Sequence, residues 1–358
     1  MSLKLKYITA GLKTLSSITR NKLFGYRSPL LSYLLVTNRC NLDCVYCYSE
    51  EHKSENLDIP FEELCQVIDQ LKESGTILVS IMGGEPTIRR DLGKIIDYIS
   101  KRGMMVELLT SGYYLERHLN SMNNLDFLAI SIDGDESAHE KNRGVGSYKA
   151  AMHALELAHQ QGIHTRIHVT LTRENEDSLD HVMDIARKYN VKVNCVVASK
   201  HRDNPALLFD NEKIKDYYHK MREYLASGYP ISNAKVTVDY MINWQGNYDY
   251  VSDRPHDKLP YLPCKRKDFS FYLDANGDAY PCVPVWAQYK FNIKDHGVQG
   301  AFDEFQKITC TNCIMEAEFN HLFNGSLSSL FNMIAIGLVD KLKNIFSGAQ
   351  TEEPELER

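Results

Sequence analysis

The sequence contains no long apolar run. The longest, LFNMIAIGLV at 330–339, is about half of the ~20 residues that a membrane-spanning helix needs. An N-terminal apolar segment followed by a small-residue cleavage site, which would indicate a secretory signal, is also missing. These absences predict a cytoplasmic protein without a spanning helix.

Acidic residues are missing from the start of the chain. Asp43 is the first of them, whereas the basic residues that precede it are Lys4, Lys6, Lys13, Arg20, Lys22, Arg27 and Arg39. The whole chain nevertheless carries a net charge of −6. This overall charge excludes a general binder of polyanions, so we expect no nucleic-acid partner.

Residues 1–28 are expected to form a basic amphipathic helix. At about 100° per residue, one side collects Leu5, Ile8, Leu12, Leu15 and Ile18, and the other side collects Lys6, Lys13 and Arg20. Such a helix can lie on an anionic membrane surface as a peripheral contact. It can equally dock against the bottom of a barrel, and the sequence leaves both arrangements open.

Strand-like and helix-like segments alternate downstream. Apolar strands are predicted at 30–36, 76–82, 104–110, 125–133, 163–172 and 191–197, and helices at 61–75, 91–103, 147–162 and 176–190. Near-continuous apolar strands between helices are typical of a parallel sheet covered on both faces. No GxGxxG turn follows a strand. The predicted fold is therefore α/β, a partial (βα)6 TIM-like barrel over residues 29–230 rather than an open dinucleotide-binding sheet.

The rest of the chain predicts a small α+β module at 231–320. Within it, FSFYLDANGDAYPC at 269–282 predicts a hairpin that turns at Ala-Asn-Gly-Asp. We also expect an apolar C-terminal helix at 321–348 and a disordered acidic tail at 349–358.

Cysteine usage points to metal or redox chemistry. Nine cysteines, an odd number, favour such chemistry over disulfides in a chain interpreted as cytoplasmic. Cys40, Cys44 and Cys47 stand in CNLDCVYC just after the first strand, at the end where parallel βα folds place active sites. Three thiolates fit a zinc site completed by a distant His or Cys. They also fit a [4Fe–4S] cluster whose fourth iron is open to another ligand.

CNLDCVYC resembles the C-x3-C-x2-C signature of the radical S-adenosylmethionine (SAM) superfamily. MGGEP at 82–86 resembles the GGE motif of the same family, also at a strand end. The resemblance implies that Cys40, Cys44 and Cys47 ligate a [4Fe–4S] cluster and that SAM chelates its open iron. The SAM contacts that it implies are Gly83, Gly84 and Glu85 at the methionyl amino group, Tyr46 near the adenine, Ser111, Ser131 and Asp133 at the ribose and backbone of SAM, and Arg143 at the carboxylate. The alternatives are a plain core aromatic for Tyr46 and a solvated charge at a helix start for Arg143.

A second set of cysteines follows the barrel. Cys264, Cys282, Cys310 and Cys313 resemble the twitch module, a shortened form of the SPASM extension, which implies an auxiliary [4Fe–4S] cluster; a zinc ribbon is the alternative. Gly277 is expected to supply the turn of the hairpin. Cys65 and Cys195 are interpreted as core thiols.

The resemblance implies a radical SAM enzyme that cleaves SAM reductively and abstracts hydrogen from a small-molecule or lipid substrate, with the auxiliary cluster accepting an electron. A one-electron donor such as flavodoxin or ferredoxin is the expected partner. Two alternatives stay open: a maturase of ribosomal peptides, and a non-catalytic zinc or iron–sulfur protein. The short stretch before the first strand leaves no room for a folded peptide-recognition domain, which favours a substrate other than a peptide.

Overall fold

Parallel strands form the centre of the molecule. The computed structural model describes residues 3–47, 58–198, 211–244, 251–252, 262–283, 289–308, 312–313 and 317–326. The central strands are β1 (Leu31–Leu35), β2 (Leu78–Met82), β3 (Met105–Thr110), β4 (Phe127–Ser131), β5 (Thr165–Leu171) and β6 (Lys192–Val197). They pair in parallel and in chain order, and β6 does not pair with β1 in the described part of the chain. The predicted partial barrel is confirmed.

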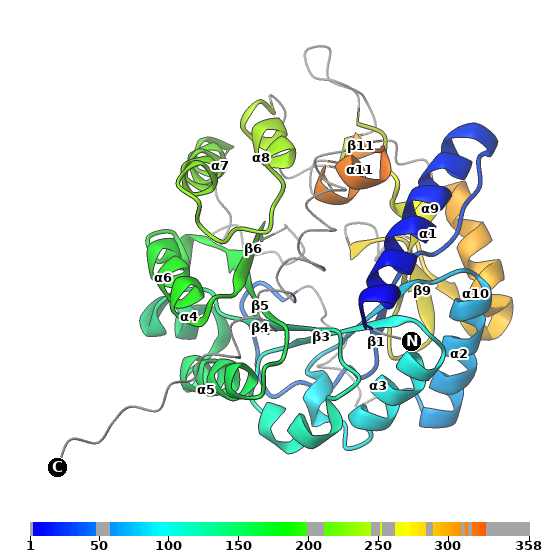
Figure 1. Ribbon diagram of the computed structural model, residues 1–358, viewed down its shortest axis with the longest axis horizontal. Helices are drawn as coiled ribbons and strands as arrows, with labels where there is room; N and C mark the ends of the chain where they lie inside the picture. Colours follow the sequence, from blue (N-terminus) through cyan, green and yellow to red (C-terminus); the bar gives the residue numbers. More distant parts are fainter. Residues whose placement is uncertain are drawn as a thin grey trace.

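Helices surround this sheet (Figure 1). In chain order they are α2 (Phe61–Glu73), α3 (Leu92–Lys101), α4 (Glu136–Arg143), α5 (Ser147–Gln160) and α6 (Leu179–Tyr189), with 3₁₀ turns at Pro86–Ile88, Leu115–Ser121 and Arg173–Asn175. In α2 the residues Leu64, Val67, Ile68 and Leu71 are buried, which is the spacing of one helix face. The apolar periodicity from which these helices were predicted thus corresponds to the face that each helix buries.

Helix α4 was not predicted. It begins at Asp135, whose side chain accepts a hydrogen bond from the backbone N–H of Ala138 at 2.9 Å, as an N-cap residue does. It ends at Gly144, where φ is 103°. Arg143 is therefore the last residue of a helix and only 7% exposed. The alternative of a solvated charge at a helix start is wrong, because the helix runs before Arg143 and not after it.

The hairpin at 269–282 is confirmed, and it joins the central sheet. Strand β8 (Ser270–Leu273) pairs antiparallel with β9 (Asp278–Tyr280). At the turn, Gly277 has φ of 91° and its N–H donates to the carbonyl oxygen of Asp274 at 3.1 Å. β8 also pairs in parallel with β1, so the hairpin extends the barrel sheet beyond its first strand. Sequence periodicity did not predict the pairing of β8 with β1. The proposed boundary near residue 230, between the barrel and the C-terminal module, stays a prediction.

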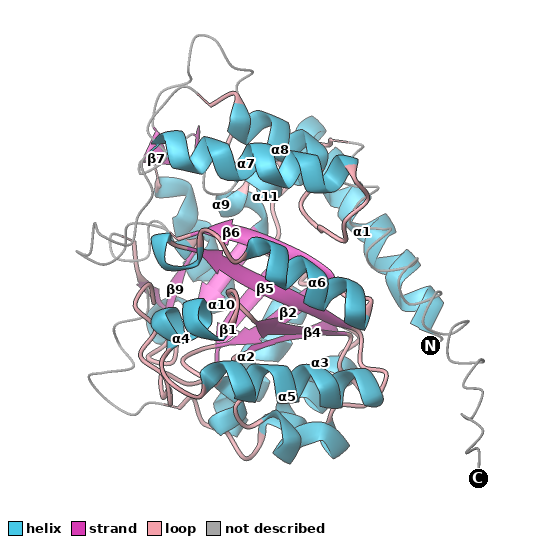
Figure 2. Ribbon diagram, turned by 90° about the vertical axis from the view of Figure 1, so that its left-hand side faces the viewer, coloured by secondary structure: helices cyan, strands magenta, loops and turns pink. Residues whose placement is uncertain are grey.

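Several shorter elements complete the described chain. They are α7 (Asn211–Ala226), α8 (Lys235–Ile242), β7 (Val251–Ser252), α9 (Arg266–Phe269), β10 (Phe291–Asn292), α10 (Ile293–Glu304), a 3₁₀ turn at Phe305–Lys307, β11 (Asn312–Cys313) and α11 (Ala317–Phe323). Figure 2 shows α7 and α8 beyond the β6 edge of the sheet. The tail at 349–358, and the predicted helix at 321–348 from residue 327 onwards, lie outside the described residues.

The N-terminal helix α1 (Leu3–Phe24) lies along the outside of the molecule (Figures 1 and 2). Ile18 is buried against Leu30 and Ile77, so placing Ile18 in the same stripe as Ile8 and Leu12 was wrong. The sequence left two arrangements open for this helix, and docking against the bottom of the barrel is the one that the structure shows. Among the described residues, no helix is long and apolar enough to cross a bilayer.

Candidate functional site

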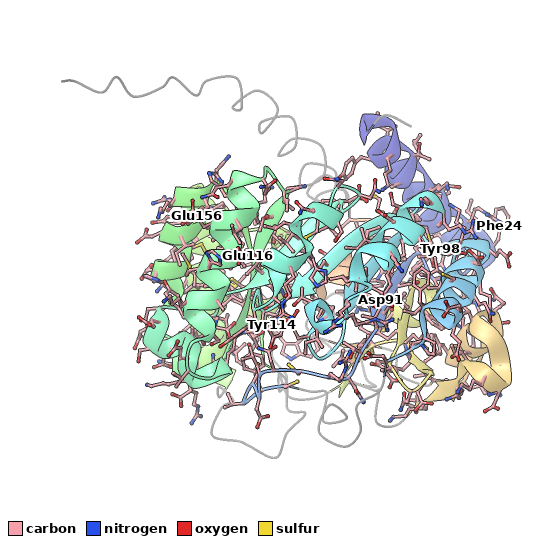
Figure 3. The ribbon with its side chains drawn as sticks, turned by 90° about the horizontal axis from the view of Figure 1, so that it is seen from below. Phe24, Asp91, Tyr98, Tyr114, Glu116 and Glu156 are labelled. Atoms are coloured by element: carbon pink, nitrogen blue, oxygen red, sulfur yellow. The ribbon has the colours of Figure 1, made fainter. Side chains whose placement is uncertain are left out.

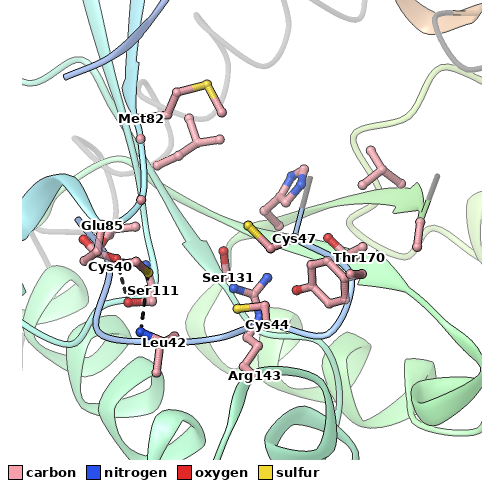
Figure 4. Close-up of a pocket in the computed structure, with 18 of the residues that line it drawn as sticks. Cys40, Leu42, Cys44, Cys47, Met82, Glu85, Ser111, Ser131, Arg143 and Thr170 are labelled. Atoms are coloured by element: carbon pink, nitrogen blue, oxygen red, sulfur yellow. Dashed lines mark hydrogen bonds between the residues drawn. The ribbon is translucent and has the colours of Figure 1, made fainter. Parts of the chain in front are cut away.

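A cavity of about 270 Å³ lies at the carboxyl ends of the central strands. Figure 4 shows the cysteine loop after β1 running past the side chains that line this cavity. The walls are formed by Cys40, Leu42, Cys44, Tyr46, Cys47, Met82, Gly83, Gly84, Glu85, Leu109, Thr110, Ser111, Ser131, Arg143, His168, Thr170, Val196, Val197 and Ala198. Every residue predicted for the first cluster and for SAM lines this cavity, except Asp133, which is buried directly behind it.

The backbone of the GGE motif holds the start of the cysteine loop in place. The N–H of Gly84 donates to the carbonyl oxygen of Thr37 at 2.9 Å, and the N–H of Glu85 donates to that of Arg39 at 2.8 Å. A Cβ on Gly83 would overlap the Thr37 carbonyl oxygen, and one on Gly84 would overlap that of Arg39. Glycine is therefore needed for the close approach of two backbone segments next to Cys40. Contact of these glycines with the methionyl amino group of SAM stays a prediction.

The carboxylate of Glu85 organises the adjoining wall. It accepts hydrogen bonds from the hydroxyl of Thr110 at 2.6 Å, from the N–H of Ser111 at 2.8 Å and from the hydroxyl of Ser111 at 2.6 Å. The N–H and hydroxyl of Thr87 bind the same carboxylate. Glu85 is 1% exposed, and these donors compensate its burial. Its side chain thus ties the end of β2 to the end of β3, and Ser111 comes to the cavity through this network.

The three cysteines of the first set face one cavity. Figure 4 shows Cys40 near Glu85 and Ser111, with Cys44 and Cys47 near Arg143. None of the three forms a disulfide. The backbone N–H of Val45 donates to the carbonyl oxygen of Asn142 at 2.9 Å, which anchors the middle of the loop to α4.

Burial controls the protonation of these thiols. It raises the pKa of Cys40 to about 12. It also raises the pKa of Cys44 to about 11, although the positive charge of Arg143 opposes the shift. Without a metal both groups are neutral thiols, and a coordinated metal deprotonates such ligands outright.

A buried ion pair joins the end of α4 to the segment after β4, and the cysteine loop is attached to it through Tyr46. Arg143 donates to Asp133 from Nε at 2.7 Å and from Nη2 at 3.3 Å. The hydroxyl of Tyr46 donates to the same carboxylate at 2.6 Å, and the N–H of Thr170 does so at 3.0 Å. Burial acts to raise the pKa of Asp133, but the charge and hydrogen bonds of Arg143, together with His139 and Tyr46, outweigh burial and lower that pKa. Tyr46, predicted near the adenine, is thus also a structural partner of Asp133.

The same contacts refine two further predictions. Asp133 is enclosed by three protein partners, so its carboxylate supports the cavity wall from behind. Arg143 uses Nε and Nη2 to bind Asp133, while Nη1 makes no hydrogen bond within the described residues. Binding of a SAM carboxylate by Arg143 stays a prediction, with Nη1 as the available donor. Ser131 lines the cavity at the end of β4 as expected.

Sequence reasoning missed one side of the cavity. His168 and Thr170 on β5 and Val196 on β6 form it. Burial lowers the pKa of His168 to about 4, so its ring is neutral at physiological pH. The signal was present in the alternation of Arg166, His168 and Thr170, which places polar side chains on one face of an otherwise apolar strand.

The second cysteine set is described only in part. Cys264 is half-buried and Cys282 is buried, and neither forms a disulfide. Cys313 belongs to β11, which pairs antiparallel with β7, and Cys310 lies outside the described residues. Cys195 is buried in β6, as expected of a core thiol, whereas Cys65 is only half-buried on α2. The auxiliary ligand set stays a prediction.

The chemistry of the first cysteine set fits an iron–sulfur cluster. Thiolates are soft ligands that suit both zinc and iron–sulfur clusters. Cys40, Cys44 and Cys47 line one cavity, and three thiolates leave one iron of a [4Fe–4S] cluster open to a further ligand. A zinc site completed by another side chain stays the alternative.

Comparison with known proteins identifies the core. Residues 34–186 match the radical SAM superfamily. Fe-coproporphyrin III synthase of Methanosarcina barkeri is 28% identical over 45% of this chain and 41% of its own length. Mycofactocin maturase MftC of Mycolicibacterium smegmatis is 31% identical over 46% of this chain and 43% of its own length. The chain thus spans less than half of these two relatives.

Two further similarities extend beyond the core. The subtilosin biosynthesis protein AlbA of Bacillus subtilis is 25% identical over 75% of this chain and 58% of its own length. The crystal structure of Streptococcus suis SuiB bound to S-adenosylmethionine superposes with a TM-score of 0.62 at 16% identity, covering 81% of this chain and 69% of SuiB. At that identity the superposition supports the fold alone. The segment that matches the radical SAM superfamily, residues 34–186, carries the cysteine loop, the GGE motif and Arg143.

Proposed function

We propose that this protein is a radical SAM enzyme that cleaves SAM reductively and abstracts a hydrogen atom from an organic substrate. The observation that carries the proposal is that three thiols, the GGE backbone and Arg143 line one cavity. When bound, a [4Fe–4S] cluster and SAM supply a 5′-deoxyadenosyl radical for hydrogen abstraction.

The protein's own part in this chemistry is positioning and enclosure. Cys40, Cys44 and Cys47 would hold the cluster, with the loop fixed by the GGE backbone on one side and by α4 on the other. Ser111, Ser131 and Nη1 of Arg143 would orient SAM. Leu109 and Val197 add apolar side chains to the cavity wall, which would limit the access of water to a reactive intermediate once cluster and SAM are bound.

The proposal has a direct test. The chain, reconstituted anaerobically with iron and sulfide, is incubated with SAM and either dithionite or reduced flavodoxin, and 5′-deoxyadenosine is quantified. We expect its formation to depend on both the cluster and the reductant. SAM that stays intact in a chain with a full iron complement would contradict the proposal.

For the substrate, we propose a peptide as the first candidate. The similarity to AlbA, a bacteriocin biosynthesis protein, covers 75% of this chain, whereas the match to Fe-coproporphyrin III synthase covers 45%. A small-molecule or lipid substrate, as expected from the sequence, is the second candidate, supported by the Fe-coproporphyrin III synthase similarity. Cys264, Cys282, Cys310 and Cys313 would hold an auxiliary cluster that supplies an electron acceptor.

A paired assay separates the two candidates. Peptides encoded by small reading frames beside the gene are compared with tetrapyrrole precursors of Fe-coproporphyrin III, each with SAM and reductant, and products are followed by mass spectrometry. We expect a peptide to lose hydrogen atoms in proportion to the 5′-deoxyadenosine formed. Conversion of the tetrapyrrole with unchanged peptides would instead support the second candidate.

A further inference from the structure

Helix α1 packs onto the protein through its polar face. Thr14, Ser17 and Asn21 are all buried. Asn21 donates from Nδ2 to the carbonyl oxygen of Tyr26 at 2.8 Å, and it accepts at Oδ1 from Nζ of Lys265 at 2.8 Å. These bonds fix the rotation of the helix about its axis, because any turn would leave buried polar groups without partners.

The contacts of α1 place it at the amino ends of the strands. Lys6 forms an ion pair of 2.6 Å with Asp126, which directly precedes β4. Ile18 packs against Leu30 and Ile77, which precede β1 and β2. The cavity opens at the opposite, carboxyl end of the same strands. The helix therefore occupies the face of the barrel that lies away from the candidate active site.

The apolar stripe of α1 is left on the outside. Ile8 is 49% exposed, Leu12 64%, Leu15 46% and Leu23 67%. At about 100° per residue these four side chains project within roughly 80° of one another. Phe24, 79% exposed, continues the surface at the end of the helix, and Figure 3 shows it at the outer edge of the molecule. An amphipathic helix that buries its polar face and exposes its apolar one marks an interaction surface.

The charge around this stripe is positive. Helix α1 contains no acidic residue. On the helical wheel, Lys22 flanks the stripe on one side and Lys13 and Arg20 flank it on the other. Lys72 of α2 adds a further basic side chain to the same region. Burial lowers the pKa of Lys72, and the positive charge of the nearby Lys13 lowers it further. An apolar stripe between basic flanks complements a surface that is apolar inside and anionic at its boundary.

We propose that the α1 surface, formed by Ile8, Leu12, Leu15, Leu23 and Phe24 with Lys13, Arg20 and Lys22, docks on an anionic lipid bilayer. The apolar side chains enter the region between headgroups and acyl chains, and the basic side chains contact lipid phosphates. Since the cavity faces the opposite end of the barrel, docking in this way leaves its mouth open to the aqueous phase. Membrane contact through α1 therefore concentrates the enzyme at a surface and does not by itself deliver a lipid to the cavity.

Flotation of the full chain with vesicles tests the proposal. Vesicles of equal parts phosphatidylglycerol and phosphatidylcholine are compared with vesicles of phosphatidylcholine alone, at low and at high salt. We expect flotation with the anionic vesicles, reduced by salt. The Leu12→Asp/Leu23→Asp variant and the Lys13→Glu/Arg20→Glu variant should each lower the partition coefficient at least about tenfold.

Val145→Asp is the matched control, because Val145 is 91% exposed on another part of the surface and its substitution should leave flotation unchanged. Thermal unfolding without vesicles is measured in parallel. We expect the Leu12→Asp/Leu23→Asp variant to unfold at the wild-type temperature, because both side chains face solvent. A clear fall in that temperature would show that the stripe is covered within the chain and would overturn the proposal. So would sedimentation as a dimer that these substitutions dissociate, or flotation that they leave unchanged.

Discussion

At the residue scale, Arg143 has a structural role in addition to the ligand contact predicted for it. Its predicted contact is a SAM carboxylate, but in the structure its guanidinium is shared with Asp133, which is 1% exposed. A buried carboxylate that loses its cation has an uncompensated charge, and breaking such a pair costs about 3–5 kcal/mol. The arginine thus stabilises the barrel even in the absence of cofactor.

Arg143→Ala should therefore lower the free energy of unfolding by about 3–5 kcal/mol, measured by urea denaturation of the cluster-free chain at neutral pH. Lys141→Ala is the control on the same helix, because Lys141 is exposed and its partner Glu174 lies 3.7 Å away. Exposed pairs of this kind contribute about 0–1 kcal/mol. If both variants unfold at the same urea concentration, the structural role of Arg143 is wrong.

Substitution of Gly84 distinguishes a structural role of the GGE glycines from a role in ligand binding. A Cβ at this position would overlap backbone atoms of Arg39, which cannot move aside as a side chain could. Gly84→Ala should cost about 1–3 kcal/mol of unfolding free energy, the usual range for overpacking, measured in the cluster-free chain by urea denaturation.

Gly11→Ala is the matched control for that substitution. Gly11 lies within α1, and a Cβ added to it would meet no heavy atom within 4 Å, so alanine should stabilise the helix by about 0.5–1 kcal/mol. A Gly84→Ala chain as stable as wild type would mean that this glycine serves only a bound ligand.

At the element scale, the contact of α8 with α11 was not predictable from sequence. The carboxylate of Glu318 accepts two hydrogen bonds of 3.2 Å from the N–H of Ala234, the residue that caps α8. Burial raises the pKa of Glu318 to about 7, although hydrogen bonds from Thr237 and Ala234 oppose the shift. A glutamate with a raised pKa binds its proton more tightly in the folded than in the unfolded state. Its contribution to stability is therefore complete below about pH 4.5 and is lost as the pH rises through about 7.

Glu318→Gln should remove this pH dependence. Because one pKa unit corresponds to 1.36 kcal/mol, the variant should gain about 1–3 kcal/mol over wild type at pH 8 and little at pH 5, by urea denaturation. Glu116→Gln is the control, since Glu116 is exposed. Parallel stability curves for wild type and Glu318→Gln between pH 5 and pH 8 would rule out a buried, titrating Glu318.

Elements with strong local periodicity were predictable, and contacts between distant segments were not. The strands β1 to β6 and the helices α2, α3, α5 and α6 between them follow from apolar runs and helical spacing, whereas α4 does not. The parallel pairing of β8 with β1 joins segments more than 200 residues apart, for which a single sequence offers no local signal. The cysteine loop and the GGE motif were found because both are short and contiguous. His168 and Val196 were missed because they share only a cavity, not a motif.

At the scale of the whole molecule, the chain is expected to carry two separate iron–sulfur clusters. Replacing Cys310 and Cys313 together by alanine should remove about four irons per chain and leave the first cluster intact, measured by iron analysis and electron paramagnetic resonance. The variant should still cleave SAM but fail to release oxidised product. An unchanged iron content would exclude these two residues as ligands.

The cavity around Cys40, Cys44 and Cys47 is the feature on which the proposed chemistry depends most. The direct measurement is reductive SAM cleavage by the chain in which all three are replaced by alanine, beside a Cys65→Ala chain that keeps the cavity unchanged. We predict that the triple variant retains about half of the wild-type iron, in the auxiliary cluster, and forms no 5′-deoxyadenosine, while Cys65→Ala forms it at the wild-type rate. Formation of 5′-deoxyadenosine by the triple variant would contradict the assignment of this cavity to SAM cleavage.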